Sequence, residues 1–152
     1  MKIKEIMAKE IISLSKGTKI KDAFKKLLEM HISGLPVLDE NLRVLGMFTE
    51  KEILKAVLPG YLESVGRFIY EENPKIIRKK LLDIQDLTVE QLMRKDVITV
   101  DEDTTLCEVA RIMLTQNVRR IPVLNKEKKI TGIVAREDIL KQFAKDIGLY
   151  NE

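Results

Sequence analysis

Two pairs of residues occupy places where a hydroxyl and a carboxylate could bind a phosphate and a ribose, and only the first pair has both groups. Thr49 and Glu52 form one pair, and Ala135 and Asp138 occupy the same places in a second, similar stretch. Each pair opens a stretch with helical apolar periodicity, so we expect both pairs at helix N-termini. Such a terminus offers unpaired N–H groups and a partial positive charge, which together bind phosphate. The hydroxyl can donate to a phosphate, and the carboxylate can accept from both ribose hydroxyls.

The first pair also has an explanation that needs no ligand. Thr49 and Glu52 fit a capping box, which satisfies two N-terminal N–H groups and is worth about 1 kcal/mol. Ala135 has no side-chain oxygen, so we predict that Asp138 does not complete such a box. Asp138 is therefore the more suggestive carboxylate of the two.

Two adjacent arginines give a further candidate for phosphate binding. Arg119 and Arg120 precede an apolar run, and their counterparts in the first half of the chain are Ser33 and Gly34. Paired guanidinium groups suit phosphate oxygens. Without a ligand, the two side chains would point to opposite faces of a strand, with one of them solvated. Both interpretations remain open at this point.

Catalysis has little support in the sequence. The chain has one histidine, His31, and one cysteine, Cys107, which lie in different halves and in no recognisable motif. They give no support for a Cys–His nucleophile or a zinc site. No phosphate-binding P-loop or dinucleotide fingerprint is present either. We therefore predict that the protein is not an enzyme and binds no metal, and that His31 has a structural or helix-end role.

The elements that position these residues occur twice. Residues 3–58 match residues 89–144 without a gap, and Met7 falls on Met93, an offset of 86 residues. Two such units indicate supersecondary modules packed by approximate two-fold symmetry, because each alone would leave an apolar face uncovered. Symmetric packing of this kind also tends to create clefts.

Each repeat has the pattern strand, helix, two strands in a hairpin, helix. The first strand is predicted at 11–14 and 97–100, and the following helix has the i, i+3, i+4 spacing of one buried face. Gly46 and Gly132 lie inside a hairpin strand, which marks a bulge or a close approach by another backbone or a ligand. We predict an α+β (mixed α/β) fold of two β-α-β-β-α repeats in one module.

The predicted organisation has three parts. Residues 1–58 are the first repeat, 59–88 a helical connecting segment, and 89–152 the second repeat with a C-terminal tail. Within the connecting segment, 61–70 and 75–84 could each form a helix.

Composition excludes several classes of protein. Hydrophobic residues make up 45% and charged residues 34% of the 152 residues, which is typical of one globular domain. The net charge of +3 comes from interspersed charges, which argues against a nucleic-acid partner. The single cysteine rules out an intrachain disulfide. We see no signal peptide and no apolar run of about 20 residues, so we expect no membrane association and a cytoplasmic location.

The ordered set of motifs resembles a tandem pair of cystathionine-β-synthase (CBS) domains. The resemblance rests on Pro-Val-Leu at 36–38 and 122–124, followed in each repeat by a glycine and an acidic residue before isoleucine. It covers both repeats but not the connecting segment or the tail. It implies two repeats packed through their sheets, with two clefts related by a pseudo-two-fold axis, and modules that often form dimers. Such clefts commonly bind AMP, ADP, ATP or S-adenosylmethionine.

The resemblance also implies which residues bind the ligand. The family motif Gly-h-x-(Thr/Ser)-x-x-Asp falls on Thr49 and Glu52, where glutamate extends the carboxylate by one methylene, and on Ala135 and Asp138, where the hydroxyl is missing. The two clefts should therefore bind unequally, and we favour the one with Asp138 and the adjacent arginines. Adenine is expected near Ile12, Ser13, Ile98, Thr99, Pro36 and Pro122.

We therefore predict a stand-alone regulatory module that binds an adenine nucleotide or a related adenosyl ligand in a cleft between the repeats, as a homodimer and with no certain cofactor. The alternative is a ligand-free dimerisation or protein-interaction scaffold, which the incomplete motifs favour. The basic run at 78–80 is then either a solvated helix face or a docking site for an acidic partner. Nucleic-acid binding is a third class, which the small number of aromatic residues disfavours.

Overall fold

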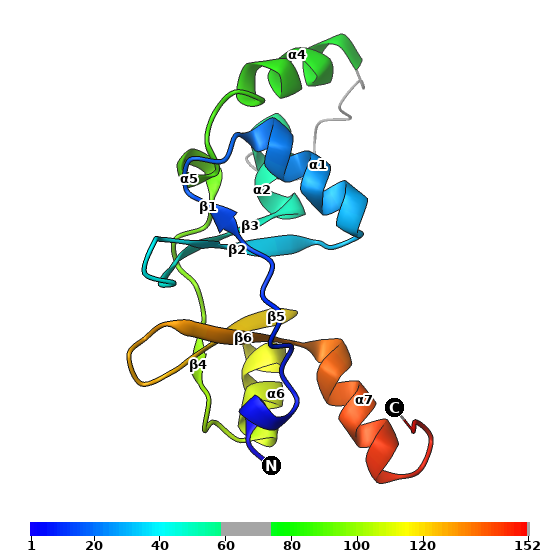
Figure 1. The fold of residues 1–152 in the computed structure, drawn as a ribbon. Coiled ribbons are helices and arrows are strands. Elements are labelled where there is room, and N and C mark those ends of the chain that lie inside the picture. Colours follow the sequence, from blue (N-terminus) through cyan, green and yellow to red (C-terminus); the bar gives the residue numbers. More distant parts are fainter. Residues whose placement is uncertain (59–73, 152) are drawn as a thin grey trace. The chain divides into compact units, whose positions relative to one another are not determined.

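The computed structural model describes residues 1–58 and 74–151 (Figure 1). Its strands form two three-stranded sheets, and the order strand, helix, strand, strand, helix occurs twice. The predicted mixed α/β fold is therefore confirmed. The helix predicted at 61–70 lies outside the described residues. Within the described ranges, no helix is long and apolar enough to cross a membrane.

The chain divides into two compact units. We call them the first-repeat unit and the second-repeat unit, after the sheet that each contains. The first-repeat unit comprises Ser13–Asp39 and Leu45–Val97. The second-repeat unit comprises Met1–Ile12, Glu40–Val44 and Ile98–Glu152. Residues 1–12, which open the first repeat, thus belong to the unit of the second sheet. Residues 89–97, which open the second repeat, belong to the unit of the first sheet.

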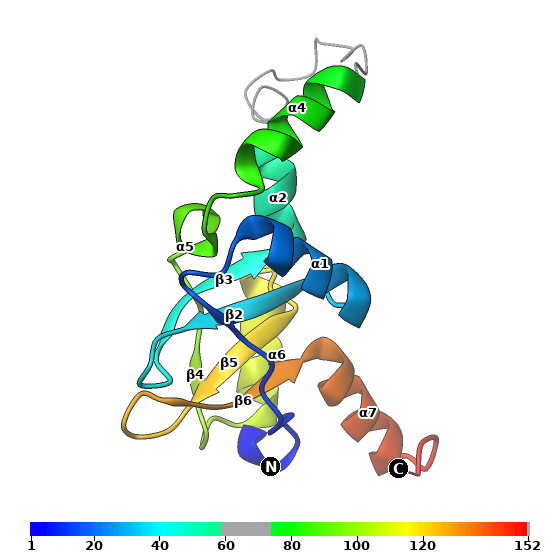
Figure 2. The ribbon, with the colours of Figure 1, turned by 45° about the horizontal axis from the view of Figure 1, so that its top comes forward.

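The first-repeat unit is built around the sheet β1-β2-β3, whose helices α1 and α2 lie on one side of it (Figures 1 and 2). β1 runs parallel to β2, with Leu14 opposite Val37. The helix predicted at 75–84 is observed and begins with proline, whose fixed φ suits the first helical position. The elements are β1 (Leu14–Ser15), α1 (Ile20–Met30), β2 (Gly34–Leu38), β3 (Val44–Thr49), α2 (Glu50–Val57), α4 (Pro74–Ile84) and α5 (Val89–Leu92).

The second-repeat unit repeats this plan with the sheet β4-β5-β6. β4 runs parallel to β5, and β5 runs antiparallel to β6. The N-terminal turn lies beside α6 (Figures 1 and 2), where the Leu106 N–H donates to the Met1 carbonyl at 2.9 Å. The elements are the 3-10 helix η1 (Ile3–Glu5), β4 (Val100–Asp101), α6 (Leu106–Thr115), β5 (Arg120–Leu124), β6 (Ile130–Ala135) and α7 (Arg136–Asp146).

Each sheet also receives one residue from outside its own repeat. In the second-repeat unit, Ala8 and Ile133 exchange two backbone hydrogen bonds of 2.9 and 3.0 Å. In the first-repeat unit, Met47 and Arg94 exchange two of 2.9 Å. The segments around Ala8 and Arg94 are therefore held by their main chains at the outer edge of a sheet.

These contacts explain the glycines inside β3 and β6. A Cβ added at Gly46 would lie 2.8 Å from the Arg94 carbonyl oxygen, and one at Gly132 would lie 2.9 Å from the Ala8 carbonyl oxygen. Methionine sulfur atoms at 93 and 7 lie against the same positions. Close approach by another backbone, one of the explanations that the sequence left open, is therefore observed at both glycines. The bulge is also observed beside Gly132, where the β5–β6 register shifts between Val123 and Leu124.

The first strand of each repeat is shorter than predicted. The predictions at 11–14 and 97–100 were wrong in extent, because only Leu14–Ser15 and Val100–Asp101 join a sheet. Upstream of each strand, the chain is already bonded elsewhere, at Ala8 to β6 and at Arg94 to β3. The apolar residues in between therefore connect two different sheets and cannot extend either ladder.

Candidate functional site

Asp138 lies in the first turn of α7 and caps it. Its Oδ2 atom accepts from the backbone N–H of Ala135 at 2.7 Å. The prediction that Asp138 takes no part in a capping box was therefore wrong, because the carboxylate half of the box does not depend on a side-chain oxygen at Ala135. The Oδ1 atom has no hydrogen-bond partner among the described residues. One carboxylate oxygen thus remains available for donors such as ribose hydroxyls.

The strand β5 brings Arg120 to this helix terminus. Arg120 is the direct partner of Ala135 in the antiparallel ladder and is partly buried. Arg119 is exposed, and its carbonyl accepts from the Arg136 N–H at 3.0 Å. The backbones of both arginines therefore lie next to the N-terminus of α7, which Asp138 caps. Guanidinium groups and helix N-termini both attract phosphate.

The two repeats differ at one cross-strand pair. In the first-repeat unit, a Cβ added at Gly34 would lie 2.6 Å from Thr49 Cγ2 and 3.1 Å from its Cβ. The equivalent pair in the second-repeat unit is Arg120 opposite Ala135. A side chain at the first position of this pair therefore requires a small residue at the second. The first repeat has a threonine opposite glycine at this pair, and the second has an alanine opposite arginine.

Thr49 and Glu52 form the predicted capping box at the start of α2. Glu52 Oε1 accepts from the Thr49 N–H at 3.1 Å and from the Thr49 hydroxyl at 2.8 Å. The same hydroxyl accepts from the Lys51 N–H at 3.2 Å. Glu52 is 7% exposed. The hydroxyl and carboxylate of the first repeat are thus bonded to each other and to the helix, which leaves fewer groups for a ligand.

A pocket of about 330 Å³ lies beside Glu52, between α2 and α5. Its lining includes the cationic side chains of Lys55 and Arg94, and neither has a hydrogen bond or ion pair to another described residue. Sequence reasoning missed both cations. The sequence did contain a signal for Arg94. At the repeat offset it aligns with Ala8, so the second repeat has a charged side chain where the first has a methyl group.

The residues expected to contact adenine lie at the start of the short strands. Thr99 and Ser13 immediately precede β4 and β1, one position before the pairs Val100–Val123 and Leu14–Val37. The parallel register therefore places them beside Pro122 and Pro36, which are fully buried. Ile98 and Ile12 are the preceding residues, and both are partly buried.

His31 has the predicted helix-end role. It is the C-cap of α1 in the left-handed conformation, with φ 54° and ψ 41°. Its counterpart Asn117 has φ 52°. Histidine and asparagine tolerate this conformation better than most residues with a Cβ. Cys107 is exposed.

The cation next to Asp138 is Lys141, one turn further along α7. Its ammonium lies 3.1 Å from the Glu137 carboxylate, whose hydrogen bond and charge raise the pKa of Lys141, with a smaller contribution from Asp138. Lys141 therefore remains charged at neutral pH and balances part of the acidic first turn of α7.

Comparison with known proteins places this fold in a family. The family model of the CBS domain matches residues 3–59 and 89–145, which together make up most of the chain. The protein belongs to the CBS domain family and carries two CBS repeats.

The chain is similar to other proteins in sequence and in structure. Protein MJ1404 from Methanocaldococcus jannaschii is 32% identical over 94% of this chain, and the chain spans 32% of that protein. The CBS domain pair of protein MJ0100, in complex with 5′-methylthioadenosine and S-adenosyl-L-methionine, is 27% identical with a TM-score of 0.68, covering 96% of this chain and 98% of that one. CBSX2, a CBS-pair protein from Arabidopsis thaliana, in complex with AMP is 23% identical with a TM-score of 0.73, covering 95% and 97%.

Proposed function

We propose that this protein is a regulatory CBS-pair module that binds an adenine nucleotide in its second-repeat unit. The observation that carries the proposal is that Arg120 pairs in the ladder with Ala135, the N-cap of α7, whose N–H donates to Asp138. The guanidinium and the helix N–H groups suit phosphate, and the second carboxylate oxygen suits ribose hydroxyls. The adenosyl ligands of the MJ0100 pair support an adenosyl ligand here.

Among adenosyl ligands we favour the phosphorylated ones, AMP, ADP or ATP. Two arginines and a helix N-terminus attract an anion, whereas S-adenosylmethionine carries a sulfonium cation next to its ribose. No catalytic role enters this proposal, and the site would act by changing its occupancy with the nucleotide pool. A homodimer and a cytoplasmic location also remain predictions.

Isothermal titration calorimetry with AMP, ADP, ATP and 5′-methylthioadenosine tests the proposal. Asp138→Asn keeps an oxygen for the Ala135 N–H and removes the charge, so it should weaken every adenosyl ligand by about tenfold to a hundredfold. Arg120→Gln should weaken only the phosphorylated ligands, because 5′-methylthioadenosine has no phosphate. Glu52→Gln in the first repeat is the matched control and should leave this binding event unchanged.

One set of observations favours a second candidate, a ligand-free interaction scaffold. Both Glu52 and Asp138 make helix-capping bonds that need no ligand. If none of the four compounds binds at millimolar concentration, the scaffold explains the protein better. If Asp138→Asn binds AMP as well as the natural protein does, the proposed ribose contact is wrong.

A further inference from the structure

Helix α4 exposes a row of positively charged side chains. The helix carries four lysine or arginine residues and one acidic residue, Asp83. Three of these cations and one leucine follow the i, i+3, i+4, i+7 spacing of a single helix face, and all four are exposed. We call this surface the cationic face of α4, and its residues are Lys75, Arg78, Lys79 and Leu82.

Two charges of this face have no partner in the part of the chain that the structure describes. Arg78 and Lys79 make no hydrogen bond or ion pair to another described residue. Lys21 on α1, by contrast, lies 3.2 Å from the Asp86 carboxylate. Lys75 and Lys79 are one helical turn apart, where like charges repel and destabilise a helix. A partner that supplies carboxylates would remove this repulsion.

The opposite face of α4 is turned toward the rest of the first-repeat unit. Its apolar side chains Ile77, Leu81 and Ile84 are partly buried, and the helix packs on α2. Lys80 is partly buried too, so the fourth cation of the helix does not belong to the cationic face. The apolar side chains that a membrane-bound helix would insert are therefore already engaged.

The helix lies away from the sheet of its unit and is held at its C-terminal end. Figures 1 and 2 show α4 beyond α1 and α2, at the end of the first-repeat unit farthest from the sheet β1-β2-β3. Just after the helix, the Gln85 carbonyl accepts from the Lys21 N–H at 3.0 Å. The Leu87 carbonyl accepts from the Ile20 N–H at 2.8 Å. The helix itself buries no residue, so it adds little to the core, while the main chain fixes where its charges are presented.

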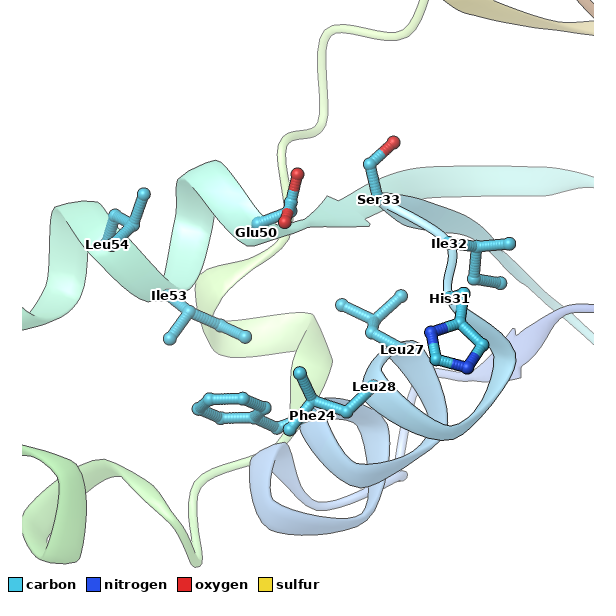
Figure 3. Close-up of a pocket in the computed structure, with 9 residues that line it drawn as sticks. All are labelled: Phe24, Leu27, Leu28, His31, Ile32, Ser33, Glu50, Ile53 and Leu54. Atoms are coloured by element: carbon cyan, nitrogen blue, oxygen red, sulfur yellow. The ribbon is translucent and has the colours of Figure 1, made fainter.

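The same unit has a pocket whose chemistry differs from that of the cationic face. The pocket has a volume of about 450 Å³ and lies between α1 and α2, and Figure 3 shows mainly leucine, isoleucine and phenylalanine side chains around it. Glu50 lines it, and its described lining contains no lysine or arginine. An acidic partner would therefore be attracted to α4 and not to this pocket.

The residues of α4 favour one class of negatively charged partner. The helix contains no aromatic residue on which a nucleic-acid base could stack. A membrane surface needs a broad apolar face, and the exposed apolar residues of α4 are only Ile76 and Leu82, at 54% and 50% exposure. An acidic polypeptide suits the face best, because its carboxylates can pair with the cations while an apolar side chain contacts Leu82.

We propose that the cationic face of α4 binds an acidic segment of another protein. The segment places carboxylates on Arg78 and Lys79 and an apolar side chain on Leu82, which lies one turn from both cations. Of the basic run at 78–80, only the first two residues take part. The surface lies outside the residues that match the CBS domain, so the proposal depends neither on the nucleotide nor on the homodimer.

Fluorescence anisotropy of the full chain with labelled acidic peptides tests the proposal. A synthetic glutamate peptide with one central leucine should bind, with an affinity that falls as salt is added. Arg78→Gln and Lys79→Gln should each weaken binding by about twofold to fivefold, the range of an exposed ion pair. Lys80→Gln removes the same charge at the next position and is the matched control, which should leave the affinity unchanged.

Leu82→Ala separates the apolar contact from the charge. It should weaken the leucine-containing peptide by about fivefold, because less apolar area is buried, and should leave a peptide with serine in place of the leucine unaffected. Circular dichroism melting of each variant confirms that it is folded. Calorimetric titration with AMP should be the same for all of them, so this proposal and the proposed nucleotide site can be lost separately.

Three results would overturn the proposal. The first is no binding of either peptide at low salt. The second is an equal loss of affinity in Lys79→Gln and Lys80→Gln, which would mean that overall charge alone attracts the peptide. The third comes from single-stranded DNA and phosphatidylserine vesicles measured alongside: if either binds through Arg78 and Lys79 while the peptides do not, the class of partner is wrong.

Discussion

The cross-strand pair of Gly34 and Thr49 gives the most direct test of how the two repeats diverged. In Gly34→Ala, the new Cβ would lie 2.6 Å from Thr49 Cγ2, 3.1 Å from Thr49 Cβ and 3.2 Å from the Phe48 carbonyl oxygen. The first distance is far inside van der Waals contact, and the site is buried in a sheet. Overpacking of this kind costs about 2 kcal/mol, within the usual range of about 1–3 kcal/mol.

A double-mutant cycle isolates the contact between the two residues. Thr49→Ala alone removes the helix cap and should cost about 1 kcal/mol. Independent effects would sum to about 3 kcal/mol, but the double variant loses the Cγ2 atom that causes the collision, and we expect a total near 1 kcal/mol. The variant pair reproduces in the first repeat the small residue found at Ala135 in the second.

Urea denaturation and thermal melting of the four proteins supply the measurement. At about 2–4 °C per kcal/mol for a chain of this size, the melting temperature should fall by about 4–8 °C in Gly34→Ala and by about half as much in the double variant. Gly17→Ala is the control, because a Cβ there meets nothing within 4 Å. Two results would contradict this reasoning. Gly34→Ala could have as little effect on stability as Gly17→Ala, or the free-energy costs of Gly34→Ala and Thr49→Ala could add in the double variant.

Two further predictions concern the N-terminal segment and its place on the second sheet. Gly132→Ala should destabilise the protein by about 2 kcal/mol, because the Ala8 carbonyl lies 2.9 Å from the added Cβ and belongs to a backbone that cannot rotate away; a melting temperature equal to that of Gly17→Ala would contradict this. Hydrogen bonds from Lys4 and Lys2 hold the pKa of Asp103 below its usual 3.8, so this carboxylate contributes stability above pH 3.8 that is lost as the pH falls through its folded pKa. Asp103→Asn should therefore flatten the dependence of melting temperature on pH below 3.8, and an unchanged dependence would contradict this.

Much of the fold follows from local patterns in the sequence. The helix α1 was predicted because Ile20, Ala23 and Leu27 recur at helical spacing, and these are the residues that it buries. The capping box of Thr49 and Glu52 is complete in sequence and was confirmed in structure. Such features need only residues a few positions apart, so the sequence carries enough information for them.

The errors occurred where distant segments meet. The strand predicted at 11–14 ends up mostly outside the sheet, because Ala8 is bonded to β6 while Leu14 is bonded to β2. The role of Asp138 was misjudged because its bond goes to a backbone N–H, which every residue type except proline supplies. Neither fact has a signature in side-chain identity.

The sequence alone determined that the chain contains two CBS repeats, that their motifs are unequal, and that the second has arginines where the first has serine and glycine. Only the tertiary structure shows that two of these differing positions are in contact. Arg120 and Ala135 are neighbours across two strands, and Gly34 and Thr49 show that this neighbourhood has room for only one large side chain. Contacts between strands depend on register and on distances of a few ångström, which periodicity does not encode.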